Sequence, residues 1–532
     1  MRNLSVFMAI PILLLAVSGA QGQTPAKPAV TAPAKKELPS FDLIEHAAFP
    51  LDHHLESKDL AAGMMKVQDI YEDGAKLFHT PYNGLDGVGV RRLPNGTPAL
   101  RFSPVPIGGG MLTSPSSQAC GSCHAFPYAA SAGLAHTDLA FDPGADGLPP
   151  FNIRSTTSLF GDGLLQLLAQ EITEQLQAQR DRATEAAAKS PGKAVRQELR
   201  ANNVRYGVLV ATADETGKIS LDLSGLEGVD PDLVVRPFGW KGNITSLRSN
   251  TIGPANFVMG MQPEEFVWKA PDGGANADPD GDGVTRELSV GDITAMVVYT
   301  ASQETPQPVS RLVELGMIAA SDAATVAKVE KGRALFQKAG CTSCHLPEMH
   351  LANTVFEEPT TRGNGNYYDH MLAAKDKDYD PTRPVRFDLL GDSQPPHAAR
   401  LSDGGAQVLL YGDLKRHHMG RQLADPGGPA PPIISDFAPL QMDGKVVLIP
   451  ATDFLTTELW GVGNTGPYLH DARAGTLEEA VLLHGEDKPT AAGDPGRSEA
   501  QEARDAFAAL SKDDRAALVT FLRSLLTFSP QD

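Results

Sequence analysis

Two copies of the pattern Cys-x-x-Cys-His use every cysteine of the chain, the first at Cys120, Cys123 and His124 and the second at Cys341, Cys344 and His345. In this spacing two thiols lie about one helical turn apart, so both can bond to the vinyl groups of one porphyrin. The histidine that follows is then placed to ligate the iron. The sequence therefore predicts two covalently bound haem c groups.

Three other uses of paired cysteines fit less well. A structural zinc site usually has its two pairs close together, whereas Cys123 and Cys341 are far apart in this chain. A thioredoxin-like redox centre needs only one pair, and two disulfides need no histidine after either pair. A histidine directly after both pairs, with no cysteine left over, favours haem attachment.

The N-terminal residues have the composition of a secretory signal. Arg2 precedes an apolar run at 6–17, and small residues follow at 18–22. We expect residues 1–22 to be a cleaved signal peptide and 23–40, rich in Pro, Ala and Lys, to be a disordered leader. The run is too short to span a bilayer comfortably, and we predict a periplasmic protein without a membrane span.

Composition and charge limit the partners. The chain has 532 residues, 41% of them hydrophobic, which is enough for two or three packed domains. Its formal net charge of −19 argues against nucleic acid as a partner. An acidic surface is compatible with an electron-donor or electron-acceptor protein.

The elements that must position the two motifs are mainly helical. Asp73–Phe78 and Lys331–Phe336 are similar, and each reads as a helix ahead of a haem motif. We predict a mainly α fold with two cytochrome c-like haem domains, at 41–160 and 321–532, separated by an insert at 161–320.

Local patterns predict the elements of the insert and of the C-terminus. An apolar stripe from Leu164 to Leu176 indicates a long helix. Residues 204–212 and 218–223 alternate as the strands of a small β-hairpin. Two amphipathic helices are expected to close the chain, the second capped by Ser511.

An acidic segment of the insert could bind calcium. Asp278, Asp280 and Asp282 stand at alternate positions, followed by Gly283. Position twelve of this loop is Ser289 rather than glutamate, which disfavours a standard EF-hand. A calcium-binding turn and a plain hydrophilic turn both remain open.

The stretches Gly332–Met349 and Phe454–Gly485 resemble the di-haem oxidoreductase family, whose members are related to the bacterial di-haem cytochrome c peroxidases. The most specific part is Pro467–Asp471 followed by Thr476–Ala480, and the Phe-Gly-Trp-Lys pattern at Phe238–Lys241 extends the match into the insert. The resemblance implies two cytochrome c-like domains with an electron relay between the haems. It implies a peroxidase-type enzyme that reacts with peroxide or another small oxidant.

The resemblance also assigns iron ligands. It makes His124 and His345 the proximal ligands, and His484 stands where the peroxidase relatives place the Met ligand of the C-terminal haem. A second imidazole lowers haem potential relative to a thioether, so this haem is expected to be a low-potential electron relay. Met419, in a loop expected to be mobile, is the alternative ligand.

The N-terminal haem is expected to keep an open or water-bound site, because no residue matches its sixth ligand; His136 is a weaker candidate for that ligand. Trp240 is the expected relay, and Glu264 or Glu265 the candidate acid–base group for cleaving the O–O bond. The alternative function is a non-catalytic di-haem electron-transfer cytochrome c.

Overall fold

The computed structural model describes residues 54–61, 63–88, 111–112, 117–125, 132, 136–141, 151–267, 283–303, 313, 322–360, 380, 382–391, 398–432, 439–487 and 496–526. All of them lie in one compact unit, Ala48–Asp532. The expected signal peptide, the leader and the three aspartates of the calcium loop fall outside the described residues. No described helix is both long and apolar enough to cross a membrane.

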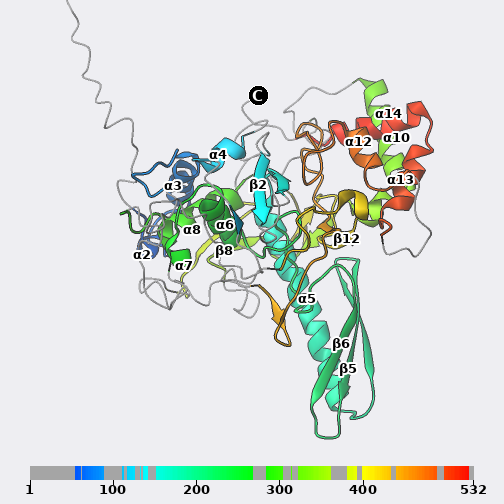
Figure 1. Ribbon diagram of the computed structural model, residues 1–532, viewed down its shortest axis with the longest axis horizontal. Helices are drawn as coiled ribbons and strands as arrows, with labels where there is room; N and C mark the ends of the chain where they lie inside the picture. Colours follow the sequence, from blue (N-terminus) through cyan, green and yellow to red (C-terminus); the bar gives the residue numbers. More distant parts are fainter. Residues whose placement is uncertain are drawn as a thin grey trace, which may run out of the picture. The chain divides into compact units, whose positions relative to one another are not determined.

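Helices occur along the whole described chain (Figure 1). They are α2 (Ser57–Leu60), α3 (Val67–His79), α4 (Cys120–Cys123), α5 (Asp162–Ala188), α6 (Leu247–Phe257), α7 (Glu264–Val267), α8 (Val290–Ala301), α10 (Ala323–Lys338), α12 (Leu477–Leu482), α13 (Gln501–Ala508) and α14 (Lys512–Arg523), with short 3-10 turns η1 (Cys341–Ser343) and η2 (Arg421–Leu423). The expected capping of α14 is confirmed, because the Ser511 side chain accepts a hydrogen bond from the Asp514 backbone N–H.

Small antiparallel sheets alternate with these helices, so the described residues hold more strand than the sequence patterns indicated. The sheets are β1–β2–β3 (Met111–Leu112, His136–Phe141, Phe151–Ser155), β4–β5–β6 (Val195–Ala201, Val204–Ala213, Ile219–Leu226), β10–β11–β7 (Ala399–Arg400, Ala406–Val408, Met349–Leu351), β8–β9 (Val355–Glu358, Val385–Asp388), β12–β15 (Arg416–His418, Asp453–Leu455) and β13–β14 (Gln441–Met442, Lys445–Val446).

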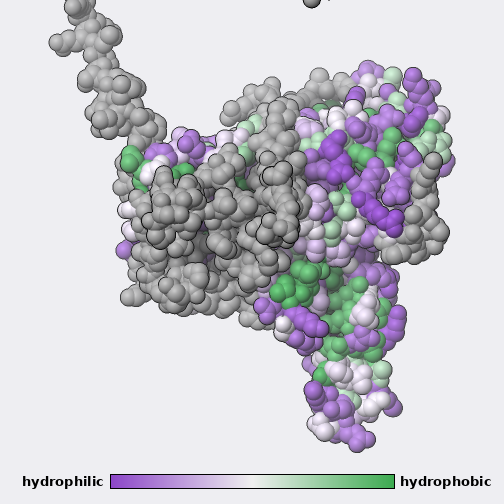
Figure 2. Space-filling model, in the orientation of Figure 1, coloured by the Kyte–Doolittle hydropathy of each residue, from purple (hydrophilic) through white to green (hydrophobic). Residues whose placement is uncertain are grey.

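The insert contains the long helix and the hairpin that the sequence predicts, plus one further strand. Helix α5 runs beside a meander of β4, β5 and β6, and the Gln179 amide of the helix bonds to the Arg200 carbonyl of β4 (Figure 1). Strand β4 was not predicted, because most of its residues are polar or charged and only Leu199 and Ala201 are buried, which is too few to give an alternating hydrophobic pattern. Hydrophilic side chains cover the lower end of the meander in Figure 2.

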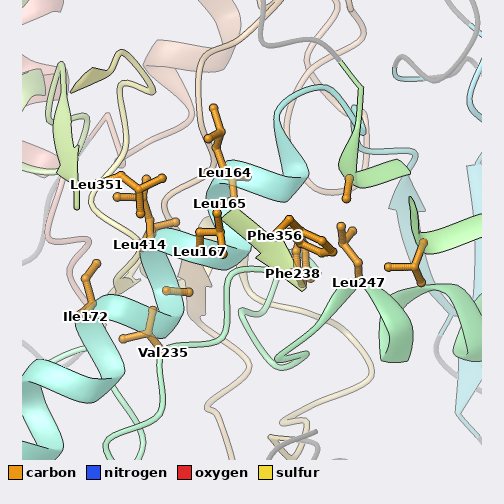
Figure 3. Close-up of a cluster of buried hydrophobic side chains, with 14 of the residues drawn as sticks. Leu164, Leu165, Leu167, Ile172, Val235, Phe238, Leu247, Leu351, Phe356 and Leu414 are labelled. Carbon is orange, nitrogen blue, oxygen red and sulfur yellow. The ribbon is translucent and has the colours of Figure 1, made fainter. Parts of the chain in front are cut away.

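The first half of α5 is buried on all sides and forms the centre of the main core (Figure 3). Leu164, Leu165 and Leu167 pack with side chains from segments distant in sequence. Those partners include Val235, Phe238, Leu247, Leu351, Phe356 and Leu414. This central helix therefore joins parts of the chain that precede and follow the second haem motif.

The predicted repeat corresponds to two equivalent helix pairs. In the first, Gly74 of α3 lies against the Ala295 carbonyl of α8; in the second, Gly332 of α10 lies against the Ala517 carbonyl of α14. Any β-carbon at either glycine would overlap that carbonyl, so the absence of a side chain lets the two helices cross at backbone distance.

Candidate haem-binding sites

The first motif forms a single helical turn, α4, beside the end of α3. The Nδ1 atom of His124 lies 3.0 Å from the Thr157 carbonyl oxygen. Since a carbonyl oxygen can only accept, Nδ1 carries the proton and the lone pair is on Nε2. The ring of Phe78 lies 6.1 Å from that of His124, on the α3 side.

The second motif has the same arrangement. Gly340 adopts a left-handed conformation, with φ of 87°, and opens the turn η1 that carries Cys341. His345 Nδ1 lies 2.9 Å from the Tyr411 carbonyl oxygen, and Phe336 lies 6.2 Å from the His345 ring. Burial lowers the pKa of His345 to about 4, so the imidazole is neutral near pH 7 and can donate its Nε2 lone pair to a metal.

His484 lies directly after α12 and belongs to the same neighbourhood. Its Nδ1 lies 2.7 Å from the Ala480 carbonyl oxygen, which again leaves the lone pair on Nε2. Burial lowers the pKa of His484. A positive charge on the His484 ring would lower the pKa of His345, so the two imidazoles are close enough to interact. The residue is half-buried at a helix end rather than on an open surface.

These donor groups fit a haem group at each motif. Histidine ligands in metalloproteins characteristically hold the ring nitrogen opposite the metal on a carbonyl or carboxylate, as all three histidines do here. Cys120 lies 3.6 Å from the Met259 sulfur among apolar neighbours. Burial raises the pKa of the Cys120 thiol to about 12 and that of Cys341 to about 11, so both thiols hold their protons near pH 7.

Beside the second motif lies a charged cluster that the sequence did not reveal. His417 bonds through Nε2 to Asp413 at 2.8 Å and through Nδ1 to Glu499 at 2.7 Å, and Nδ1 also lies 3.7 Å from Cys344 Sγ. Burial would lower the pKa of His417, but the hydrogen bonds that its ring donates to Asp413, Cys344 and Glu499 outweigh burial and raise the pKa to about 12. Asp413, His417 and Glu499 thus form an ion-paired cluster that packs on Cys344 of the second motif.

The segment around Met419 differs from its expected form. His417 and His418 lie in β12, which pairs with β15, and the Met419 N–H bonds to the Thr452 carbonyl at 2.8 Å. The segment is therefore a short paired strand up to His418, with the ion pairs of His417 beside it, rather than a loop. Its sequence, two histidines and a glycine after a charged stretch, gives no local strand signal.

Trp240 lies where segments from several parts of the chain meet. Its indole N–H donates to the Ser155 carbonyl at 2.8 Å, and its own carbonyl accepts from the Leu455 N–H at 3.0 Å. Ser155 is two residues before Thr157, the partner of His124. Arg154 on the other side forms two bonds, of 2.8 and 2.7 Å, to Asp425.

The other candidate residues are held in separate places. Glu264 accepts from Arg286 Nε and, at 3.4 Å, from the Val290 N–H, whereas Glu265 pairs with the buried Arg248. The backbone of His136 pairs with Ser155 in the β2–β3 ladder. Glu264 and Glu265 thus each hold an ion pair with an arginine, and their catalytic role stays a prediction.

Sequence reasoning missed the backbone carbonyls of Thr157 and Tyr411 and the carboxylates of Asp413 and Glu499. A carbonyl carries no residue-type signal, since every residue has one. The repeat itself gave a partial signal, because Phe78 and Phe336 occupy equivalent positions in it and each stands beside the histidine of a motif, His124 or His345.

Comparison with known proteins identifies the C-terminal part. Residues 396–525 match the family described as "Di-haem oxidoreductase, putative peroxidase", which confirms the predicted resemblance and implies haem cofactors. No curated protein matches the chain.

Two solved structures are similar over much of the length. Hydrazine synthase from Kuenenia stuttgartiensis, pressurized with 20 bar xenon, is 14% identical, with 94% of this chain and 100% of that chain covered and a TM-score of 0.32. A MauG-like protein associated with microbial copper homeostasis is 17% identical, with 60% and 80% covered and a TM-score of 0.28. Both likenesses are too distant to carry an argument about this chain.

Proposed function

We propose that this protein is an exported, periplasmic di-haem c-type oxidoreductase of the peroxidase type. The N-terminal haem, attached at Cys120 and Cys123, reacts with peroxide, and the C-terminal haem relays electrons. The observation that carries the proposal is an asymmetry between two similar motifs. His484 stands near His345 with its Nε2 lone pair available, whereas the sequence offers no matching counterpart for His124.

In this proposal the haem groups supply the redox chemistry, and the chain fixes their ligands. The Thr157 and Tyr411 carbonyls orient His124 and His345 and keep the proton on Nδ1. His484 would supply a second imidazole to the iron of a haem bound at the second motif, which would favour a low potential and exclude small ligands. A haem bound at the first motif would keep a site for peroxide.

A bonded route supports Trp240 as the relay. From His124 it passes through the Thr157 carbonyl and the backbone to Ser155, whose carbonyl accepts from the Trp240 indole. The Trp240 carbonyl then accepts from Leu455 in β15, whose partner strand β12 carries His417 beside Cys344. Trp240→Phe keeps an aromatic ring but loses the indole N–H, so we expect slower electron transfer between the haems with both haems retained.

Electron paramagnetic resonance of the ferric protein tests the proposal. We expect one high-spin signal from the N-terminal haem and one low-spin signal from the C-terminal haem. Adding peroxide or cyanide should change only the high-spin haem. Two low-spin signals that ignore both reagents would instead indicate a non-catalytic electron-transfer cytochrome. Calcium binding at Asp278, Asp280 and Asp282 is a separate prediction.

A further inference from the structure

The two equivalent helix pairs differ at one buried position beside the haem motifs. The carbonyl that contacts Gly74 belongs to Ala295, and the next turn of α8 places Tyr299 against the same glycine. In the second pair, Phe521 lies against Gly332 in the same way. Tyr299 and Phe521 are therefore structural equivalents, one with a phenol hydroxyl and one without.

The hydroxyl of Tyr299 has a specific partner. It lies 3.2 Å from Nε2 of His79, the residue that follows Phe78, although the two are 220 positions apart in sequence. The residue that follows Phe336 in the second unit is Gln337. A phenol hydrogen-bonded to an imidazole is thus a feature of the N-terminal haem unit, and the equivalent positions of the C-terminal unit lack both groups.

The pair sits in a row of rings that begins at the first haem motif. The Phe78 ring is 6.1 Å from His124 and 5.1 Å from Tyr299. Gly121, inside the first motif, packs directly against the His79 ring, where a β-carbon would overlap it. On the far side, Tyr71 lies 5.2 Å from Tyr299 and is half-buried, whereas Tyr299 is 5% exposed.

We propose that Tyr299 is a redox-active tyrosine that passes oxidising equivalents from the N-terminal haem to Tyr71 at the protein surface, with His79 as its proton acceptor. This inference rests on the proposed reaction of that haem with peroxide. Tyr71 is then the point where a one-electron reductant, such as a small phenol, is oxidised without reaching the iron.

The electrons and protons of this relay balance. Once peroxide has oxidised a haem bound at the first motif, Tyr299 would give that haem one electron and would pass its hydroxyl proton to His79 Nε2. The resulting radical takes one electron from Tyr71 and recovers the proton from His79, while Tyr71 releases its own proton to solvent. The haem gains one electron, and Tyr71 loses one electron and one proton.

The protonation states favour this direction. Burial, followed by the nearby Tyr71, raises the pKa of Tyr299 to about 12, so its hydroxyl keeps the proton until an electron leaves. Burial lowers the pKa of His79, so the imidazole is neutral near pH 7 and can accept a proton.

Freeze-quench electron paramagnetic resonance of the haem-loaded protein after mixing with hydrogen peroxide tests the relay. Wild type should give a tyrosyl radical signal. A second wild-type sample that contains ring-deuterated tyrosine assigns the signal to tyrosine. Tyr299→Phe installs the residue of the second unit and should reduce that signal to background while both haems stay bound. His79→Gln should weaken it, and Tyr71→Phe should prolong the radical at Tyr299.

Tyr82→Phe is the matched control, because Tyr82 is a buried tyrosine of the same unit whose hydroxyl bonds to the Leu77 carbonyl at 2.9 Å rather than to a base. A radical signal of equal size in wild type and Tyr299→Phe would overturn the relay. If peroxide still changes the haem spectrum in that case, the relay fails while the proposed function stands.

A haem spectrum that ignores peroxide would count against the proposed function instead. The same variants are then oxidised with flash-generated ruthenium(III) tris-bipyridine. A radical that depends on Tyr299 and His79 still supports the relay, and one that depends on neither overturns it.

Discussion

A histidine can ligate iron only when one ring nitrogen offers a lone pair, and in this chain backbone carbonyls decide which nitrogen that is. His124, His345 and His484 each direct Nδ1 at a carbonyl oxygen, at 3.0, 2.9 and 2.7 Å. A neutral carbonyl, rather than a charged side chain, fixes the tautomer of each histidine and also the plane of its ring. Three equal arrangements in one molecule favour the same role for all three side chains.

His484→Ala should open the C-terminal iron and convert its low-spin signal to high-spin, because the second imidazole is lost. His484→Met should keep the iron six-coordinate but raise its potential, since a thioether is the weaker donor to ferric iron. Potentiometric titration and electron paramagnetic resonance measure both. Met419→Ala is the control. If Met419→Ala loses the low-spin signal while His484→Ala retains it, Met419 is the ligand.

Two carboxyl groups, the buried Asp162 and the partly buried Glu458, predict a pH dependence of stability. Burial raises the pKa of Glu458 from 4.5 to about 7, and burial together with Glu458 raises the pKa of Asp162. Because the folded protein binds the Glu458 proton more tightly than the unfolded chain, the free energy of unfolding falls as pH rises from 4.5 to 7.

Glu458→Gln should remove this loss of stability. At pH 8 the free energy of unfolding of the variant should therefore exceed that of wild type by about 1–3 kcal/mol, at ~1.4 kcal/mol per pKa unit. The difference should be small near pH 4.5. Guanidinium unfolding at both pH values measures it. Glu502→Gln, at a residue whose side chain is 92% exposed, is the control and should show no such change. Equal stability of Glu458→Gln and wild type at pH 8 would show that Glu458 titrates normally.

At the scale of elements, each haem motif depends on a helix crossing that only glycine allows. Replacing a helical glycine by alanine normally stabilises a helix by about 1 kcal/mol. At Gly332 the sign should reverse, because the new β-carbon meets the Ala517 carbonyl and forces α10 away from α14. We expect a loss of about 1–3 kcal/mol from overpacking.

Thermal unfolding followed by haem absorbance measures the effect of Gly332→Ala. Gly84→Ala, in a turn rather than a helix, is the control for an added methyl group without overlap, since the nearest atom to its β-carbon is 3.8 Å away. A variant Gly332→Ala as stable as wild type would show that the crossing tolerates a methyl group.

The elements with local signals were the predictable ones. Helix α5, strands β5 and β6 and the Ser511 cap follow from periodicity and capping residues. Short strands such as β12 and β15 could not be predicted, because three residues carry no period and their pairing depends on contacts elsewhere.

The candidate sites show the same division. The cysteines and histidines of the two motifs were singled out by their spacing alone, and their attachment to haem stays a prediction. The pairing of His417 with Glu499, or of His79 with Tyr299, joins positions 82 and 220 residues apart, which no local pattern reveals.

At the scale of the whole molecule, the number of haems is the first quantity to measure. Cys120→Ala or Cys341→Ala should each leave one haem without its full covalent attachment, because each thiol forms one thioether. Mass spectrometry of the denatured protein, with the pyridine haemochrome spectrum, counts the attached groups. Recovery of two covalently bound haems from a variant lacking both Cys120 and Cys123 would refute the assignment.

The segment that holds His124 is itself held by the other end of the chain. The Ser155 N–H bonds to the His470 carbonyl at 2.8 Å, and Arg154 pairs with Asp425. A gene fragment that stops at residue 320 therefore encodes the first haem motif without the groups that fix the Thr157 carbonyl. An exchange of the two halves between relatives should therefore keep Asp425 together with Arg154, whereas the contact at His470 uses a backbone carbonyl that any residue supplies.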